Sequence, residues 1–180
     1  MSRGLRYLTG TEVSAAMPPV AERLALAERT MTALVADAEL PPKIGVHPRP
    51  GGSFAHAMPA ALRPARDGSS VADDLLGIKW VTGFADNRSV GLPAIHALVV
   101  LSDPATGVPR AILDGGPITA ERTAAVSGVA IARFAAAGAG RAAIVGAGVQ
   151  GRSHVAVLGY TLPGVEVVIY DRHPDRNSCP

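Results

Sequence analysis

Apolar and polar residues alternate with several different periods along the N-terminal part of the chain. Between Val20 and Leu40 the apolar positions recur at spacings near three, four and seven, which predicts one buried face of a helix. Pro18 and Pro19 suit the first turn of that helix, and Thr11 is the expected N-cap of a shorter helical segment before it. Short apolar runs predict strands over residues 5–8, 43–47, 54–58, 78–84, 94–101 and 108–113.

The middle of the chain has the pattern of a hairpin. Residues 102–107 are rich in Asp, Pro and Gly, which are turn residues, and they join the last two predicted strands. A polar connection is expected over residues 60–72. This region therefore predicts a mixed or antiparallel sheet.

The pattern changes again in the C-terminal third. Small apolar residues from Ile118 to Ala137 predict a long helix, which Gly138 and Gly140 can end. A buried strand over residues 142–145, a helix to about Leu162 and a strand over residues 165–170 then form a βαβ unit.

These elements predict an α/β protein with two parts. Residues 1–139 are expected to form an N-terminal α+β region, and residues 140–180 the start of a Rossmann dinucleotide-binding domain. Because a doubly wound sheet has more than two parallel strands, the second part is expected to be truncated.

The composition narrows the classes of function. The 17 basic and 15 acidic residues give a net charge of +2 without a basic run, so we expect no nucleic-acid partner. The longest apolar stretch is broken by Arg133 and by glycines, so we expect no membrane span and a cytoplasmic protein. One cysteine and five scattered histidines predict no metal site.

Lysine is rare in this chain. Of the 17 basic residues, only Lys43 and Lys79 are lysines. An amine can be desolvated and lose its proton, whereas a guanidinium keeps its charge. The two lysines are therefore candidates for chemistry, with chance usage as the alternative.

The glycine turn carries the most specific local motif. Gly146, Gly148 and Gly151 form a GxGxxG sequence directly after an apolar strand, and Asp171 follows 20 residues after Gly151 at the end of the next strand. The glycines permit a tight turn, close approach of a pyrophosphate and close packing of helix on strand. The amides and dipole of the helix start favour a phosphate.

The acidic residue after the second strand bears on which dinucleotide is bound. Asp171 can accept hydrogen bonds from the ribose hydroxyls, which favours NAD, while the adjacent Arg172 weakens the preference over NADP. The alternative to the whole motif is a glycine turn in an α/β domain that binds no nucleotide.

A second candidate site starts from an arginine. After the sequence DGGP, Thr119 is expected to cap the long helix, which places Arg122 in the first turn. An arginine there opposes the helix dipole unless an anion such as a substrate carboxylate binds both. The alternative is an exposed Arg122 that pairs with Glu121 or Asp114.

The two lysines lie in predicted strands. Burial of Lys79 beside Trp80 would lower the pKa of the amine and suit it to proton transfer, unless it lies on an edge strand with its stem over Trp80. Lys43 either binds a carboxylate through the point charge of its ammonium group or is a solvated residue at the end of a strand.

The roles of two further groups of residues remain open. His47 and His56 flank the loop PRPGGS and are either ligand contacts or ordinary surface or core histidines. The loop residues Asp86, Asn87 and Arg88 either line a cofactor cleft or are solvated.

The motifs occur in an order that is typical of one protein family. The chain contains, in this order, PPKIGVH, MPA, GIKWVTGF with a following DN, GLPAI, ITAERTAA and IVGAGVQG with a following Asp. Together these motifs resemble the ornithine cyclodeaminase and mu-crystallin family, over about residues 7–175. The PPKIGVHPRP segment is most similar to a bacterial branch whose members are described as a component of tyramine oxidase.

The resemblance implies a set of roles. The N-terminal sheet would pack against its copy in a homodimer, and the nucleotide domain would bind NAD. The substrate contacts would fall on Lys79, which is also the catalytic candidate, on Arg122, and on Lys43 as the nearest match for a basic residue in the earlier strand. Val149 and Gln150 would lie near the pyrophosphate. The family's catalytic aspartate would lie beyond residue 180, so these residues would hold only part of the site.

The resemblance also implies a reaction. NAD would take a hydride from the α-carbon of ornithine, the δ-amine would attack the imine, ammonia would leave, and the returned hydride would give proline. The alternatives are a cyclic ketimine reductase, an amino-acid dehydrogenase, or a non-catalytic nucleotide-binding protein or inert fragment. In each enzyme reading the partner is a small amino acid or cyclic imine.

Overall fold

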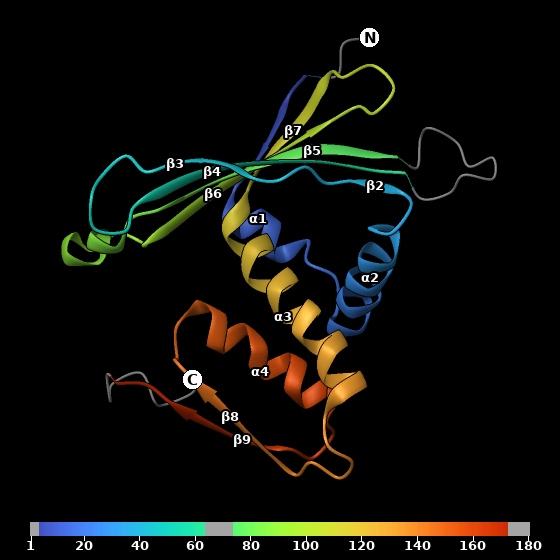
Figure 1. Cartoon of the computed structure of the whole chain (residues 1–180), viewed down its shortest axis with the longest axis vertical. Coiled ribbons are helices and arrows are strands. Elements are labelled where there is room, and N and C mark those ends of the chain that lie inside the picture. The colour runs from blue at the N-terminus through green and yellow to red at the C-terminus, as the bar shows by residue number, and fades with distance from the viewer. Residues whose placement is uncertain (1–3, 64–73, 173–180) are drawn as a thin grey trace. The chain divides into compact units, whose positions relative to one another are not determined.

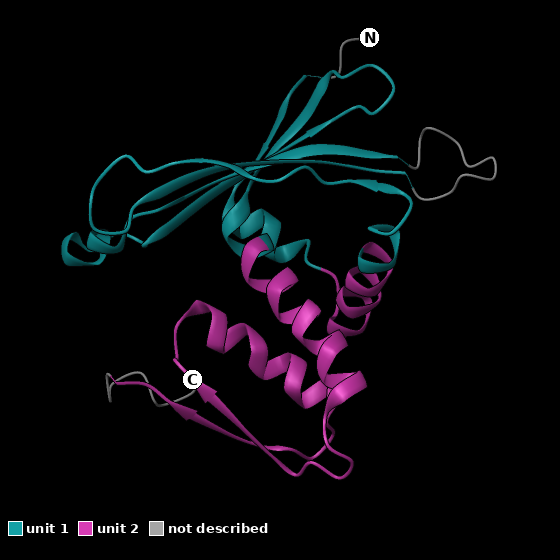
Figure 2. Cartoon of the chain, in the orientation of Figure 1, with its two compact units in different colours: residues 1–17, 31–118 teal, residues 18–30, 119–180 magenta. Residues whose placement is uncertain are grey.

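The computed structural model describes residues 4–63 and 74–172, and its chain divides into two compact units (Figures 1 and 2). Unit 1 comprises residues 1–17 and 31–118, and unit 2 comprises residues 18–30 and 119–180. This division follows the packing of the chain. The boundary at residue 139 between two functional domains stays a prediction.

Unit 1 is built on one mixed sheet of seven strands. Its strands follow the order β1-β7-β6-β5-β4-β2, and β3 also pairs with β4. Only β1 and β7 run parallel, and β6 and β7 form the predicted hairpin. The strands are β1 (Arg6–Leu8), β2 (Ala38–Glu39), β3 (Ile44–Val46), β4 (Phe54–Leu62), β5 (Leu75–Gly83), β6 (Ile95–Ser102) and β7 (Pro109–Asp114).

The helices of the N-terminal region begin and end at other residues than predicted. Thr9, not Thr11, caps α1 (Gly10–Ala15), in a capping box with Glu12. The Thr9 amide and hydroxyl both donate to Glu12, and these bonds lower the pKa of the Glu12 carboxyl. Helix α2 (Val20–Ala33) stops well before Leu40, because the chain turns into β2.

The central strands are longer than their apolar runs. β4 and β5 have nine residues each. The predicted polar connection over residues 60–72 begins inside β4, and its residues 64–72 lie outside the described residues. The loop after β5 contains a 3-10 helix, η2 (Ala85–Val90).

Cross-strand pairing gives the sheet two different faces. Side chains alternate along a strand, and residues directly opposite each other share a face. The lysine face carries the row Met58, Lys79, Val99 and Leu113, and its buried members include Val81 and Ala97. The tryptophan face carries the row Ile44, Ala57, Trp80 and Leu98.

Two aromatic rings cover glycines of neighbouring strands on the lysine face. A Cβ atom at Gly83 would lie 2.2 Å from the Phe54 ring, and one at Gly45 would lie 2.4 Å from the His56 ring. The two rings stack on each other with centroids 4.5 Å apart. Since only glycine leaves room for a ring at these positions, the contacts favour one register across β3, β4 and β5.

Unit 2 contains the predicted βαβ unit. β8 (Arg141–Val145) pairs in parallel with β9 (Glu166–Tyr170), and α4 (Val149–Thr161) connects them. Gly128 of α3 (Gly115–Phe134) gives close approach to Leu24 of α2 and Val157 of α4. Val157 is almost fully buried, so this contact is the centre of the unit 2 core.

No helix in the described part of the chain is both long and apolar enough to span a membrane.

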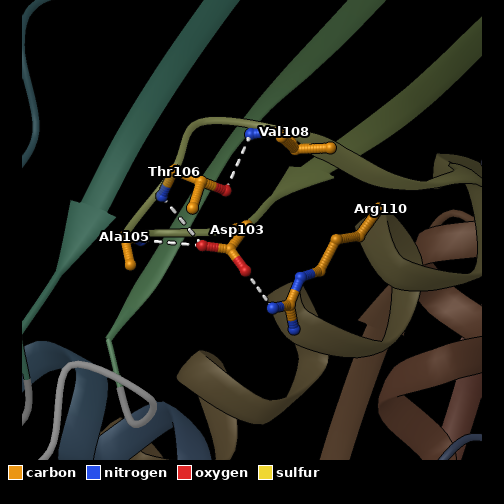
Figure 3. A network of polar contacts seen from close by, with 5 residues as sticks. All are labelled: Asp103, Ala105, Thr106, Val108 and Arg110. Carbon is orange, nitrogen blue, oxygen red and sulfur yellow. Dashed lines mark hydrogen bonds and ion pairs between the residues drawn. The ribbon is translucent and has the colours of Figure 1, made fainter. Parts of the chain in front are cut away.

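The β6–β7 turn is held by one carboxylate (Figure 3). Asp103 accepts hydrogen bonds of 2.9 Å from the amides of Ala105 and Thr106 and pairs with Arg110. Desolvation raises the pKa of the Asp103 carboxyl, but the bonds from Thr106, Arg110 and Ala105 outweigh it and the pKa is lowered overall. Ionised Asp103 therefore stabilises the turn.

We expect Asp103→Asn to be less stable than the wild type at neutral pH. Because the folded-state pKa of Asp103 is lowered, its contribution is complete above the unfolded value of about 3.9 and is lost as the pH falls through the folded value. Urea unfolding at pH 7 and pH 3 should therefore give a free-energy difference between the two proteins that narrows at pH 3. A difference that is the same at both pH values would contradict this account.

Candidate functional site

The glycine turn of unit 2 is a rigid loop with an open side. Gly146 has φ +107°, a conformation that glycine adopts without strain, and its amide donates to the Tyr170 carbonyl over 2.7 Å. A Cβ at Gly151 would lie 1.9 Å from the Gly146 oxygen, whereas a Cβ at Gly148 would meet nothing within 4 Å. The third glycine is therefore required by packing, and the second leaves space above the loop.

Two side chains fix the peptide at the centre of this loop. Asp171, at the end of β9, accepts a 2.8 Å hydrogen bond from the Ala147 amide, and the Arg152 side chain donates to the Ala147 carbonyl over 3.0 Å. Ala147 itself is buried. The structure thus brings Asp171 beside the glycine loop, where the sequence motif predicted it.

The start of α4 suits an anionic group. Gly148 is its N-cap and provides no side-chain hydrogen bond, and no acidic residue lies in the first turn. The amides of the first turn lack intrahelical acceptors and carry the positive end of the helix dipole. Together with the space at Gly148 and the carboxylate of Asp171, these residues fit the pyrophosphate and ribose of a dinucleotide. Val149 and Gln150 lie in this turn and are exposed.

A histidine links α4 to α3 inside unit 2. His154 Nδ1 lies 2.6 Å from the Gln150 carbonyl oxygen, and its Nε2 lies 2.9 Å from Ser127 Oγ. Because a carbonyl only accepts, Nδ1 must carry a proton. The hydrogen bonds connect the first turn of α4 to α3, the helix that carries Arg122.

The lysine face of unit 1 brings Lys43 and Lys79 together. Lys79 lies opposite Met58 of β4, and Lys43 directly precedes Ile44, which lies opposite Ala57. The three positions therefore form one row across adjacent strands, which places the two lysine Cα atoms about 10 Å apart. Long lysine side chains at that spacing can reach one small ligand.

The predicted surroundings of Lys79 need correction. β5 is an internal strand between β4 and β6, so the edge-strand alternative is wrong. Lys79 and Trp80 are consecutive in the strand and point to opposite faces, so Trp80 does not cover the amine. Lys79 is half-buried, with Met58 and Val99 as its direct neighbours on the two adjacent strands.

The predicted environment of Arg122 also needs correction. Helix α3 begins at Gly115 rather than at Thr119, and the Asp114 carboxylate accepts a 2.8 Å bond from the Gly116 amide at its start. Thr119 is inside the helix, with a buried hydroxyl that has no partner among the described residues. Arg122 therefore lies beyond the first turn, and the argument from the helix dipole does not apply to it.

Arg122 belongs to unit 2 and is exposed. Its two proposed alternative partners are engaged elsewhere, since Glu121 pairs with Arg23 and Asp114 caps α3. Within the described residues no hydrogen bond or ion pair reaches the Arg122 guanidinium. Its contact with a substrate carboxylate stays a prediction.

The histidine candidates lie at the end of the lysine face. His47 Nδ1 lies 3.0 Å from the Ser53 carbonyl oxygen. His56 lies next to both lysines in the register, a neighbourhood that sequence reasoning missed because cross-strand pairing is not visible in a single strand. Asn87 donates to the Pro93 carbonyl within its loop over 3.0 Å, and Asp86 and Arg88 are exposed.

The mixed sheet followed by a glycine-loop βαβ unit defines a two-part dinucleotide-fold protein. The chain belongs to the ornithine cyclodeaminase/mu-crystallin family, whose model matches residues 9–178.

Three relatives give the extent of the similarity. The nodulation efficiency protein NfeD of Rhizobium meliloti is 38% identical over 172 residues, which are 95% of this chain and 51% of the relative. The Delta(1)-pyrroline-2-carboxylate reductase of Thermococcus litoralis, solved with NADH and L-proline, has a TM-score of 0.84 at 29% identity and covers 96% of this chain and 51% of its own. An archaeal alanine dehydrogenase dimer with bound NAD has a TM-score of 0.80 at 28% identity, with 96% and 50% covered. The chain thus spans about half the length of these relatives.

Two alanine substitutions should separate the packing glycine from the ligand glycine. Gly151→Ala should lose about 2 to 3 kcal/mol of unfolding free energy, because its Cβ meets backbone. Gly148→Ala should lose no more than about 1 kcal/mol, yet weaken NADH binding because the methyl group occupies the space above the loop. Urea unfolding and a fluorescence titration with NADH measure the two effects. Wild-type NADH affinity in Gly148→Ala would refute the placement of the pyrophosphate.

Proposed function

We propose that the chain belongs to an NAD-dependent enzyme that interconverts a small α-imino acid and the corresponding amino acid. The observation that carries the proposal is that one chain holds two sets of features. The first set is an uncapped helix start with open space at Gly148 and an aspartate beside it, and the second is two lysines in one row of a sheet face. The first set fits a dinucleotide, and the second fits a carboxylate and a proton donor. The NAD and NADH complexes of the two solved relatives support the choice of cofactor.

In this proposal each basic residue has one task. The nicotinamide, when bound, supplies or accepts the hydride. Lys79 holds or moves the proton at the substrate nitrogen, and Lys43 binds the α-carboxylate. The family resemblance implies the same contact for Arg122, which is tested by itself below. A bound α-carboxylate fixes the orientation of the α-carbon, which lowers the entropic part of the barrier.

Imine reduction is the leading reaction, and ornithine cyclodeamination is the second candidate. The reductase is supported by the pyrroline-2-carboxylate reductase at 29% identity, and the cyclodeaminase by the name of the family. The two differ in their products. Ammonia release from ornithine with catalytic NAD supports the cyclodeaminase, whereas stoichiometric NADH oxidation by a cyclic imine without ammonia supports the reductase.

Lys79→Met tests the proton-transfer role. Methionine keeps most of the packing of the side chain and removes the proton carrier, so turnover should fall roughly 10² to 10⁴-fold while the Kd for NADH stays unchanged. Steady-state kinetics and NADH titration give the two values. Near-normal turnover in a folded variant would make Lys79 structural.

Arg122→Lys is the companion variant in the same assay. It keeps the charge but loses the bidentate fork, so we expect kcat/KM to fall by the equivalent of about 2 to 4 kcal/mol. An unchanged kcat/KM would remove Arg122 from the substrate site.

The tryptophan face supports a homodimer. Ile44, Trp80 and Leu98 lie in one row of this face and are 71%, 44% and 40% exposed. Val46 and Tyr7 of the same face are exposed as well. An exposed apolar row of this kind is stable in water when a second surface covers it, and we propose that a second copy of the chain does so.

A charge in the apolar row should dissociate this dimer. We expect Ile44→Lys to shift the protein toward monomer in analytical ultracentrifugation at micromolar concentration, because an ammonium group would be buried against an apolar partner. Val90→Lys is the matched control, since Val90 is 70% exposed and lies outside the sheet. A wild-type monomer, or equal effects of the two variants, would contradict the assignment of this face.

A further inference from the structure

His56 lies between the two lysines of the lysine face. It is opposite Val81 on β5 and opposite Gly45 on β3, so Lys79 and Lys43 are each its diagonal neighbour, at about 7–8 Å between Cα atoms. Lys43, His56 and Lys79 therefore form a triangle of nitrogen bases on one face of the sheet.

The His56 ring is held in place but its nitrogens are available. The ring stacks on Phe54 and lies over Gly45, where a Cβ would come within 2.4 Å of Cδ2. Within the described residues no hydrogen bond reaches either ring nitrogen. A half-buried imidazole that is held in place by stacking, but has no hydrogen-bond partner among the described residues, is suited to contact a ligand.

Two basic neighbours act on His56. Burial lowers the pKa of His56, and the positive charges of Lys43 and His47 lower it further. On the described strands, no Asp or Glu side chain belongs to the lysine face, since Glu39 and Asp114 lie opposite Ala61 and Leu98 and so point to the tryptophan face. At His56, the ammonium group of a ligand would meet the like charge of Lys43, whereas a second anionic group would meet an opposite charge.

We propose that the substrate is a dicarboxylic amino or imino acid, whose second carboxylate binds at His56 while its α-carboxylate binds at Lys43 and its nitrogen lies toward Lys79. The proposal rests on the proposed function and specifies its substrate class. It makes His56 a specificity-determining residue, because the imidazole gains a hydrogen-bond acceptor only when an anion is present. A diamino acid such as ornithine is disfavoured by the same arrangement.

The test uses succinate as a dicarboxylate probe, with butyrate and 1,4-diaminobutane as comparisons, and follows the titration of His56 by NMR. The basic groups around His56 are Lys43, His47 and Lys79, and the NMR signals of His47 and His56 are followed separately. Bound succinate should raise the pKa of His56, and its affinity should increase as the pH falls through that value. Butyrate should bind at least 10-fold more weakly, and the diamine should not compete.

His56→Gln should weaken succinate binding at least fivefold and remove its pH dependence. His96→Gln is the matched control, because His96 lies opposite Thr82 on the other face of the same sheet and should change neither. Equal affinity for succinate and butyrate, displacement by the diamine, or an unchanged affinity in His56→Gln would overturn the proposal. NADH binding and NADH-dependent imine reduction are measured separately, so their failure would refute the proposed function and not the dicarboxylate site.

Discussion

The register of β3, β4 and β5 is the constraint on which the candidate chemistry of unit 1 depends. A slip of one residue would move every side chain of a strand to the other face, so Lys79 would exchange places with Trp80. The contacts of Phe54 with Gly83 and of His56 with Gly45 oppose such a slip, because any other residue in place of these glycines would collide with a ring. Two glycines without any chemistry of their own thus keep the basic residues on one face.

Unit 2 depends on a comparable constraint at the peptide of Ala147. Its amide and carbonyl are held by Asp171 and Arg152, and Gly151 packs directly against Gly146. With the loop fixed in this way, the uncapped amides of α4 face an open space without any rearrangement. A loop that is already ordered loses little conformational entropy when an anion binds, which is a property that suits a cofactor site.

Sequence reasoning succeeded where the signal is local. The βαβ unit, the glycine turn and the position of Asp171 follow from a contiguous motif, and each is present in the structure. It failed where a competing local interaction lay a few residues away. Thr9 with Glu12 outcompetes Thr11 as a cap, and Asp114 starts α3 before Thr119 does. The grouping of His56 with Lys43 and Lys79 could not be predicted, because it depends on the pairing of three strands.

The alternation along β5 couples the two proposed roles of the sheet. Lys79 and Trp80 are adjacent in sequence, yet one faces the candidate substrate site and the other the proposed dimer contact. An antiparallel sheet can leave one face polar when its other face is covered. If a second copy covers the tryptophan face, the strand that carries Lys79 is held from behind, and its lysine face needs less apolar burial for stability. In that arrangement the covered apolar row behind β5 stabilises the strand, and the basic residues on the lysine face are tolerated.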